Sequence, residues 1–247
     1  MTVIVVPGFR PAVHGLHFPN AFPPGPTIRL GPFDPRVLGI GDAAAGLCGG
    51  MALTARDLFE AGLPAPVELE PPANGSPRFR ALVRRQVESL DWLRVPLRYF
   101  DLQARGTGAP RALGRILGRE PARVVAATRE LSRIRGTIAD GHPAVVGLVR
   151  ASGVSPRLLA RNHQVLAWSW LEEGEASGPG GGTVTLGLYD PNHPYRDDVT
   201  VRIGIDEADG RPLRDRITIR QSTGEPVLGL FLQPYPGPRS VKAWRSS

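Results

Sequence analysis

The chain has 247 residues, of which 41% are hydrophobic, and this is enough to bury the core of one domain. The formal net charge is +7, but the basic residues are all arginine apart from Lys242 and alternate with acidic residues. This mixture does not favour nucleic acid as a partner, which more often binds a segregated basic stripe. A single cysteine, Cys48, excludes an internal disulfide.

No segment has the roughly 18 consecutive apolar residues of a membrane span, and the apolar run before Pro7 is too short for a signal peptide. We therefore expect a cytoplasmic protein, with residues 1–247 forming one domain. Residues 1–40 are rich in Pro and Gly and show no helical period, which predicts an irregular segment. Its apolar side chains favour packing across the body of the protein; they are Phe9, Leu16, Phe18, Phe22, Leu30, Phe33 and Val37.

Residues 41–141 are predicted to be mainly helical. Apolar residues recur every three or four positions after Cys48, until Gly62 and Pro64 end the pattern. A second helix begins at Ser76, which suits a capping position, followed by Pro77. A third helix is expected within residues 120–141, and shorter helical pieces within residues 96–117.

Residues 142–235 contain short segments rich in β-branched residues, and residues 236–247 are expected to form a tail. A polar, glycine-rich stretch at 172–182 predicts a hairpin loop between the second and third strands. Helices followed by strands indicate an α+β fold, with an antiparallel sheet packed on the Cys48 helix. The predicted strands cover residues 143–151, 163–171, 183–190, 198–205, 214–221 and 226–233.

The thiol of Cys48 stands where a glycine-rich loop meets the predicted helix. Free backbone N–H groups and the helix dipole at that position stabilise a thiolate. The flanking Gly46, Gly49 and Gly50 leave room for a substrate backbone. The alternative interpretation is a small cysteine buried in the core.

Two further residues complete a candidate triad. His163 opens a predicted strand, and Asp190 ends the next one, so a hairpin would bring the carboxylate beside the imidazole. Asn192 is the competing third member, because an amide oxygen also accepts a hydrogen bond from the ring. Each residue has an alternative role: His163 as a surface histidine and Asp190 as a turn residue before Pro191.

The motifs around these residues, GLCGGMAL, GHPAVVGLVR, NHQVLAWSW and LYDPN, resemble papain-like cysteine peptidases of the bacteriocin-processing, C39-like kind, and more loosely bacterial proteins that share the LCGGM helix. The resemblance implies a papain-like fold with Cys48 as nucleophile, His163 as general base and acid, and Asp190 as the orienting residue. Papain-like enzymes usually have a Gln shortly before the nucleophile that donates to the oxyanion, and residues 41–47 contain none. The N–H of Cys48 and the amide of Asn20 are the candidate donors.

The sequence thus predicts a cysteine-dependent hydrolase that cleaves an amide bond, most simply in a peptide, through an acyl-enzyme. The alternatives are an acyltransferase or peptide cyclase with the same triad, and a non-catalytic binding module. No cofactor or metal is expected, since His14 and His17 lack a third ligand nearby in the sequence. The oligomeric state is not indicated.

Overall fold

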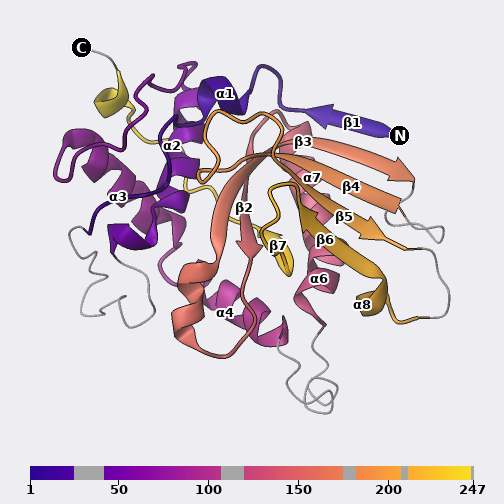
Figure 1. Ribbon diagram of the computed structural model, residues 1–247. Coiled ribbons are helices and arrows are strands. Elements are labelled where there is room, and N and C mark those ends of the chain that lie inside the picture. The colour runs from indigo at the N-terminus through magenta and orange to yellow at the C-terminus, as the bar shows by residue number, and fades with distance from the viewer. Residues whose placement is uncertain (25–41, 107–119, 175–181, 207–210, 246–247) are drawn as a thin grey trace.

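A computed structural model describes residues 1–24, 42–106, 120–174, 182–206 and 211–245 (Figure 1). Mixed helix and antiparallel sheet confirm the α+β prediction. Seven strands of the described residues form one sheet in the order β6-β5-β4-β3-β2-β7, and β1 also pairs with β3. The strands are β1 (Thr2–Val5), β2 (Ala144–Val149), β3 (His163–Gly174), β4 (Gly182–Tyr189), β5 (Thr200–Ile205), β6 (Ile217–Gln221) and β7 (Gly229–Leu232).

The helical part lies mostly to one side of the sheet, with α2 contacting both β3 and α3 (Figure 1). The longer helices are α2 (Cys48–Glu60), α3 (Pro77–Ser89), α4 (Arg94–Gly106) and α7 (Leu131–Ala139), and α6 (Ala122–Val125) leads into α7 through a π-helical turn, η3 (Ala126–Glu130). The short elements are α1 (Pro11–His14), η2 (Ala43–Ala45), η4 (Pro156–Arg161), α8 (Leu213–Arg216) and η5 (Lys242–Trp244).

Local chemistry explains where α3 starts. The Ser76 hydroxyl accepts a hydrogen bond from the Phe79 N–H at 3.2 Å, and Pro77 occupies the first helical position, as the sequence predicted. The apolar stripe of α3 then buries Phe79 and Leu82 against α2. These contacts hold α3 close to the helix that carries the cysteine.

Two apolar clusters meet at α2. One joins α2 and α7 to the sheet, and the other joins α2 and α3 to the N-terminal segment. Leu16, Phe18 and Phe22 are buried in the second cluster and Phe9 in the first, so the described part of the N-terminal segment packs as predicted. The expectations for Leu30, Phe33 and Val37 fall outside the described residues.

Two expectations are corrected by the structure. Residues 1–40 are not irregular throughout, because the β-branched run Thr2–Val5 pairs with β3 and Pro11–His14 forms a helical turn. Residues 236–247 are not simply a tail, because Val241 and Trp244 are buried beside α3. In both places contacts with residues distant in the sequence organise a short segment that shows no long period: strand pairing with β3 in the first, burial beside α3 in the second.

The close approach of α2 to α3 depends on Gly50, and this generates a prediction. A Cβ at Gly50 would lie 2.4 Å from the Leu82 carbonyl oxygen, whereas one at Gly136 of α7 would meet open space. Gly50→Ala should therefore lower the free energy of unfolding by about 1–3 kcal/mol through overpacking. Gly136→Ala should raise it by roughly 0.5–1 kcal/mol, because alanine favours the helix. Urea denaturation measures both; equal effects would contradict the packing described.

Candidate active site

Cys48 is the first residue of α2, as the sequence predicted. Asp42 accepts a hydrogen bond from the Ala44 N–H at 2.9 Å and starts the turn η2, which ends at Gly46 with a φ of 88°. That left-handed conformation favours glycine and directs the chain into α2. Cys48 is partly buried. Among the described residues, none accepts a hydrogen bond from the Cys48 backbone N–H.

The surroundings of Cys48 favour its thiolate. Burial alone raises the pKa of the Cys48 thiol, but a hydrogen bond from His163 and the charge of that ring lower it, with smaller contributions from the N–H groups of Gln164 and Gly49. The net effect is a pKa below the ordinary value. A thiolate is the form of cysteine that acts as a nucleophile.

His163 and Asp190 form a buried hydrogen-bonded pair. His163 is the first residue of β3 and Asp190 directly follows β4, its antiparallel neighbour. The Nε2 atom of His163 lies 2.6 Å from Oδ1 of Asp190. Because Nε2 is taken, Nδ1 is the ring nitrogen available for the hydrogen bond to Cys48. The imidazole thus lies between the thiol and the carboxylate.

The charge of Asp190 sets the protonation of His163. Burial lowers the pKa of the imidazole, but the charge and hydrogen bond of Asp190, joined by those of Cys48, raise it to about 9. Between the lowered pKa of Cys48 and about 9, the pair is therefore a thiolate and an imidazolium. This protonation state suits a nucleophile with an adjacent acid.

Three more groups hold the Asp190 carboxylate. The Gln221 amide donates to Oδ2 at 2.9 Å, the Asn192 N–H donates to Oδ1 at 2.9 Å, and the Arg150 guanidinium lies 3.5 Å from Oδ2. Burial raises the pKa of Asp190, but the charge and hydrogen bond of His163, the hydrogen bond from the Asn192 N–H and the charge of Arg150 hold it well below the ordinary value. The buried carboxylate is thus ionised and fixed in orientation.

Polar side chains also anchor the start of β3. The Tyr99 hydroxyl donates to the His163 carbonyl at 2.6 Å. Gln164, the next residue, accepts from the Ser89 hydroxyl at 3.0 Å and donates to Gln233 at 2.5 Å. These contacts tie β3 to α4, α3 and the segment after β7, and so fix the backbone that carries the imidazole.

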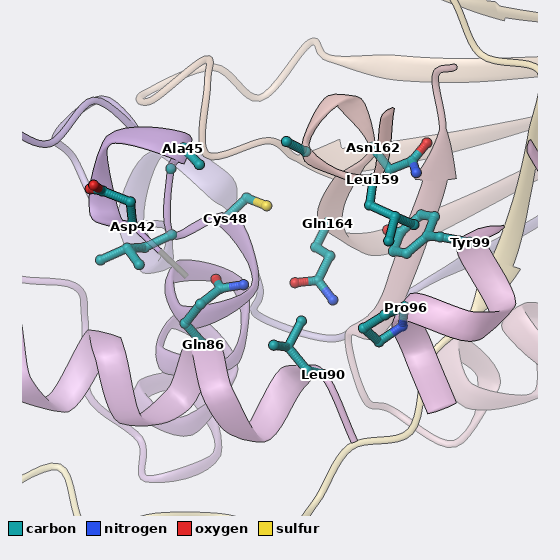
Figure 2. A pocket seen from close by; sticks show the side chains of 13 residues that line it. Asp42, Ala45, Cys48, Gln86, Leu90, Pro96, Tyr99, Leu159, Asn162 and Gln164 are labelled. Atoms are coloured by element: carbon teal, nitrogen blue, oxygen red, sulfur yellow. The ribbon is translucent and has the colours of Figure 1, made fainter. Parts of the chain in front are cut away.

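A pocket opens beside the Cys48 sulfur (Figure 2). Cys48 and the loop before it form one wall, and α3, α4, η4 and β3 supply the rest. The lining combines carboxamide groups with apolar side chains and includes Gln86, Leu90, Pro96, Tyr99, Leu159 and Gln164. A polypeptide carries apolar side chains and backbone amides, and both kinds of group could contact such a lining.

The remaining predicted site residues lie together on the loop side of Cys48. The Asn20 side chain accepts from the Leu47 N–H at 2.6 Å and donates to the Asn192 carboxamide oxygen at 3.1 Å. Asn192 therefore contacts Asp190 through its backbone and Asn20 through its side chain. Within the described residues it is Asp190, not Asn192, that bonds to the His163 ring.

Sequence reasoning missed Gln86, Arg150 and Gln221. One signal for Gln86 was present: it lies on the apolar stripe of α3, four residues from both Leu82 and Leu90, where a polar residue is unusual. Arg150 and Gln221 stand at the ends of different strands, and their meeting depends on the strand order. No sequence pattern predicts that these two residues meet.

Other histidines lie outside the triad. His193 pairs with Glu225 at 2.7 Å and His142 with Glu60 at 2.8 Å. Across the part of the chain that the structure describes, no group of three or more His, Cys, Asp and Glu side chains is arranged to hold a metal ion. None of the described helices is long and apolar enough to cross a membrane.

Comparison of the chain with protein-family models, curated proteins and solved structures gave no match.

The electrostatics of the triad generate a prediction that separates Asp190 from Asn192. Asp190→Asn removes the charge that raises the His163 pKa, so that pKa should fall from about 9 to the ordinary value near 6.5 or below, because burial still lowers it. Asn192→Ala keeps the backbone N–H that bonds to Asp190, and should leave the pKa near 9. NMR titration of the His163 ring measures both values. A larger fall in Asn192→Ala would assign the third role to Asn192.

Proposed function

We propose that the protein is a cysteine-dependent hydrolase that cleaves an amide bond, most simply a peptide bond, on a papain-like arrangement. The observation that carries the proposal is the buried hydrogen bond between Asp190 and His163, with the same imidazole beside Cys48, where its charge lowers the pKa of the thiol. A thiol at the start of a helix, facing a histidine at the start of an antiparallel strand, matches the resemblance seen in the sequence. We therefore include the papain-like family in the proposal.

The protonation state of the pair defines the first half of the reaction. The Cys48 thiolate attacks the carbonyl carbon, a C–S bond forms, and the carbonyl electron pair moves onto oxygen. As that pair returns, the C–N bond breaks and the leaving nitrogen takes the Nδ1 proton of His163. Asp190 accepts the Nε2 hydrogen bond throughout and keeps the ring in place.

The second half regenerates the thiolate. His163, now neutral, takes a proton from a water molecule as the water oxygen attacks the thioester carbon. Collapse of that intermediate breaks the C–S bond and releases a carboxylic acid. The pocket beside Cys48 supports a peptide as substrate, because its apolar side chains and carboxamides suit side chains and backbone amides respectively.

Acylation of Cys48 tests the proposal. With 4-nitrophenyl acetate near pH 7, we expect a burst of nitrophenolate and one acetyl group per chain by intact mass, followed by slow hydrolysis. His163→Asn should slow acylation by about 10²–10⁴-fold, the usual contribution of an acid–base group. His142→Asn is the matched control, because His142 pairs with Glu60 at the opposite end of α2 and should leave the rate unchanged.

A second measurement addresses the amide substrate. A mixture of peptides from a digested proteome, incubated with the protein, should yield new N-termini that Cys48→Ala does not produce. If Cys48→Ala and His163→Asn were both still acylated at the rate of the unaltered protein, this result would contradict the triad. Acylation without any cleavage of peptides would favour the acyltransferase or the binding module over the hydrolase.

A further inference from the structure

The side chain of Gln86 is held next to the nucleophile by the backbone of α2. Gln86 lies on α3 and lines the same pocket as Cys48. Its carboxamide oxygen accepts a hydrogen bond from the Gly50 N–H at 2.9 Å. Gly50 is two residues after Cys48, so this bond places the Gln86 amide within the first turn of the cysteine helix.

The Gly50 contact also decides which way the amide faces. The Gly50 N–H is a donor, so it bonds to the oxygen of the Gln86 carboxamide and not to the NH₂ group, which is also a donor. The Gln86 oxygen is thereby fixed on the helix, and its Nε2 turns into the pocket on the side of the Cys48 sulfur (Figure 2). Among the described residues, no acceptor bonds to this NH₂ group.

Three other carboxamides near the nucleophile have their donors engaged. Nδ2 of Asn20 donates to Asn192 at 3.1 Å, Nδ2 of Asn162 donates to Gln103 at 3.2 Å, and Nε2 of Gln164 donates to Gln233. The Gln86 NH₂ group is not among the fully buried groups that lack a partner, so it is open to whatever occupies the pocket. Gln86 thus presents an oriented donor that the protein itself does not use.

We propose that Gln86 Nε2, together with the Cys48 N–H, binds the oxyanion that forms when the Cys48 thiolate attacks a carbonyl group. This inference rests on the proposed hydrolase function. It assigns a catalytic residue, because the Gln86 donor contacts the reacting oxygen itself. The donor comes from a neighbouring helix, not from the loop before the nucleophile, where residues 41–47 contain no Gln.

The chemistry of the step requires such a donor. As the C–S bond forms, the carbonyl electron pair becomes a full charge on oxygen, and it returns when the C–N bond breaks. Donors fixed in advance stabilise that charge without reorganising, and removing one typically slows acyl transfer by about 10²–10³-fold. The anchoring of Gln86 on Gly50 provides this fixed orientation.

Two substitutions separate the donor from the structural contact. Gln86→Glu keeps an acceptor for the Gly50 N–H but removes the donor and adds negative charge, whereas Gln86→Met removes both. Two reactions of Cys48 are compared in each variant: acylation by 4-nitrophenyl acetate, which forms an oxyanion, and alkylation by iodoacetamide, which does not. Alkylation is measured at its high-pH plateau, where a change in the thiol pKa has no effect.

We expect both variants to lower the ratio of acylation to alkylation by about 10²–10³-fold while the plateau alkylation rate is unchanged. Asn20→Ala should lower the ratio less than Gln86→Glu. An unchanged ratio in Gln86→Glu, or a larger fall in Asn20→Ala, would overturn the assignment. Failure of the proposed function gives different results: without a reactive nucleophile the unaltered protein shows no Cys48 acylation at all, and without hydrolase activity it is acylated but cleaves no peptide.

Discussion

The buried hydrogen bond between His163 and Asp190 is the interaction on which the site depends. Transferring a carboxylate into a protein interior is costly unless other groups pair with it. Here the imidazolium of His163, the amide of Gln221, the N–H of Asn192 and the guanidinium of Arg150 surround the carboxylate. The ionised Asp190 in turn keeps His163 protonated, and the charge on His163 lowers the pKa of Cys48. The charges of Asp190, His163 and Cys48 therefore stabilise one another in sequence.

The fold positions these charges with few elements. Antiparallel pairing of β3 and β4 brings the start of one strand beside the end of the other, and α2 places the thiol across from them. Apolar clusters on both sides of α2 fix that helix between the sheet and α3. The glycine at position 50 allows α3 to come close enough for Gln86 to bond to the backbone of α2. The close packing at this contact is therefore what places Gln86 in the position that the proposal requires.

Much of this arrangement was predictable from local sequence. Strands such as β2 and β4 follow β-branched runs, and the helix starts at Cys48 and Ser76 follow loop and capping chemistry. The pairing of His163 with Asp190 followed from a hairpin. The strand Thr2–Val5 was missed because its partner is more than 160 residues away in sequence, at Ser169–Glu172. Gln86, Arg150 and Gln221 were missed for a similar reason, since their roles depend on which helices and strands become neighbours.

The charge state of Cys48 tests the account most directly. The chain has one cysteine, so ultraviolet absorbance of thiolate, followed against pH, reports that residue alone. The account predicts that thiolate appears well below the value of about 8.5 for a free thiol, and that His163→Asn moves the transition upward because the hydrogen bond and charge of the ring are lost. A transition at or above the ordinary value that His163→Asn does not shift would contradict the ion pair, and with it the proposed nucleophile.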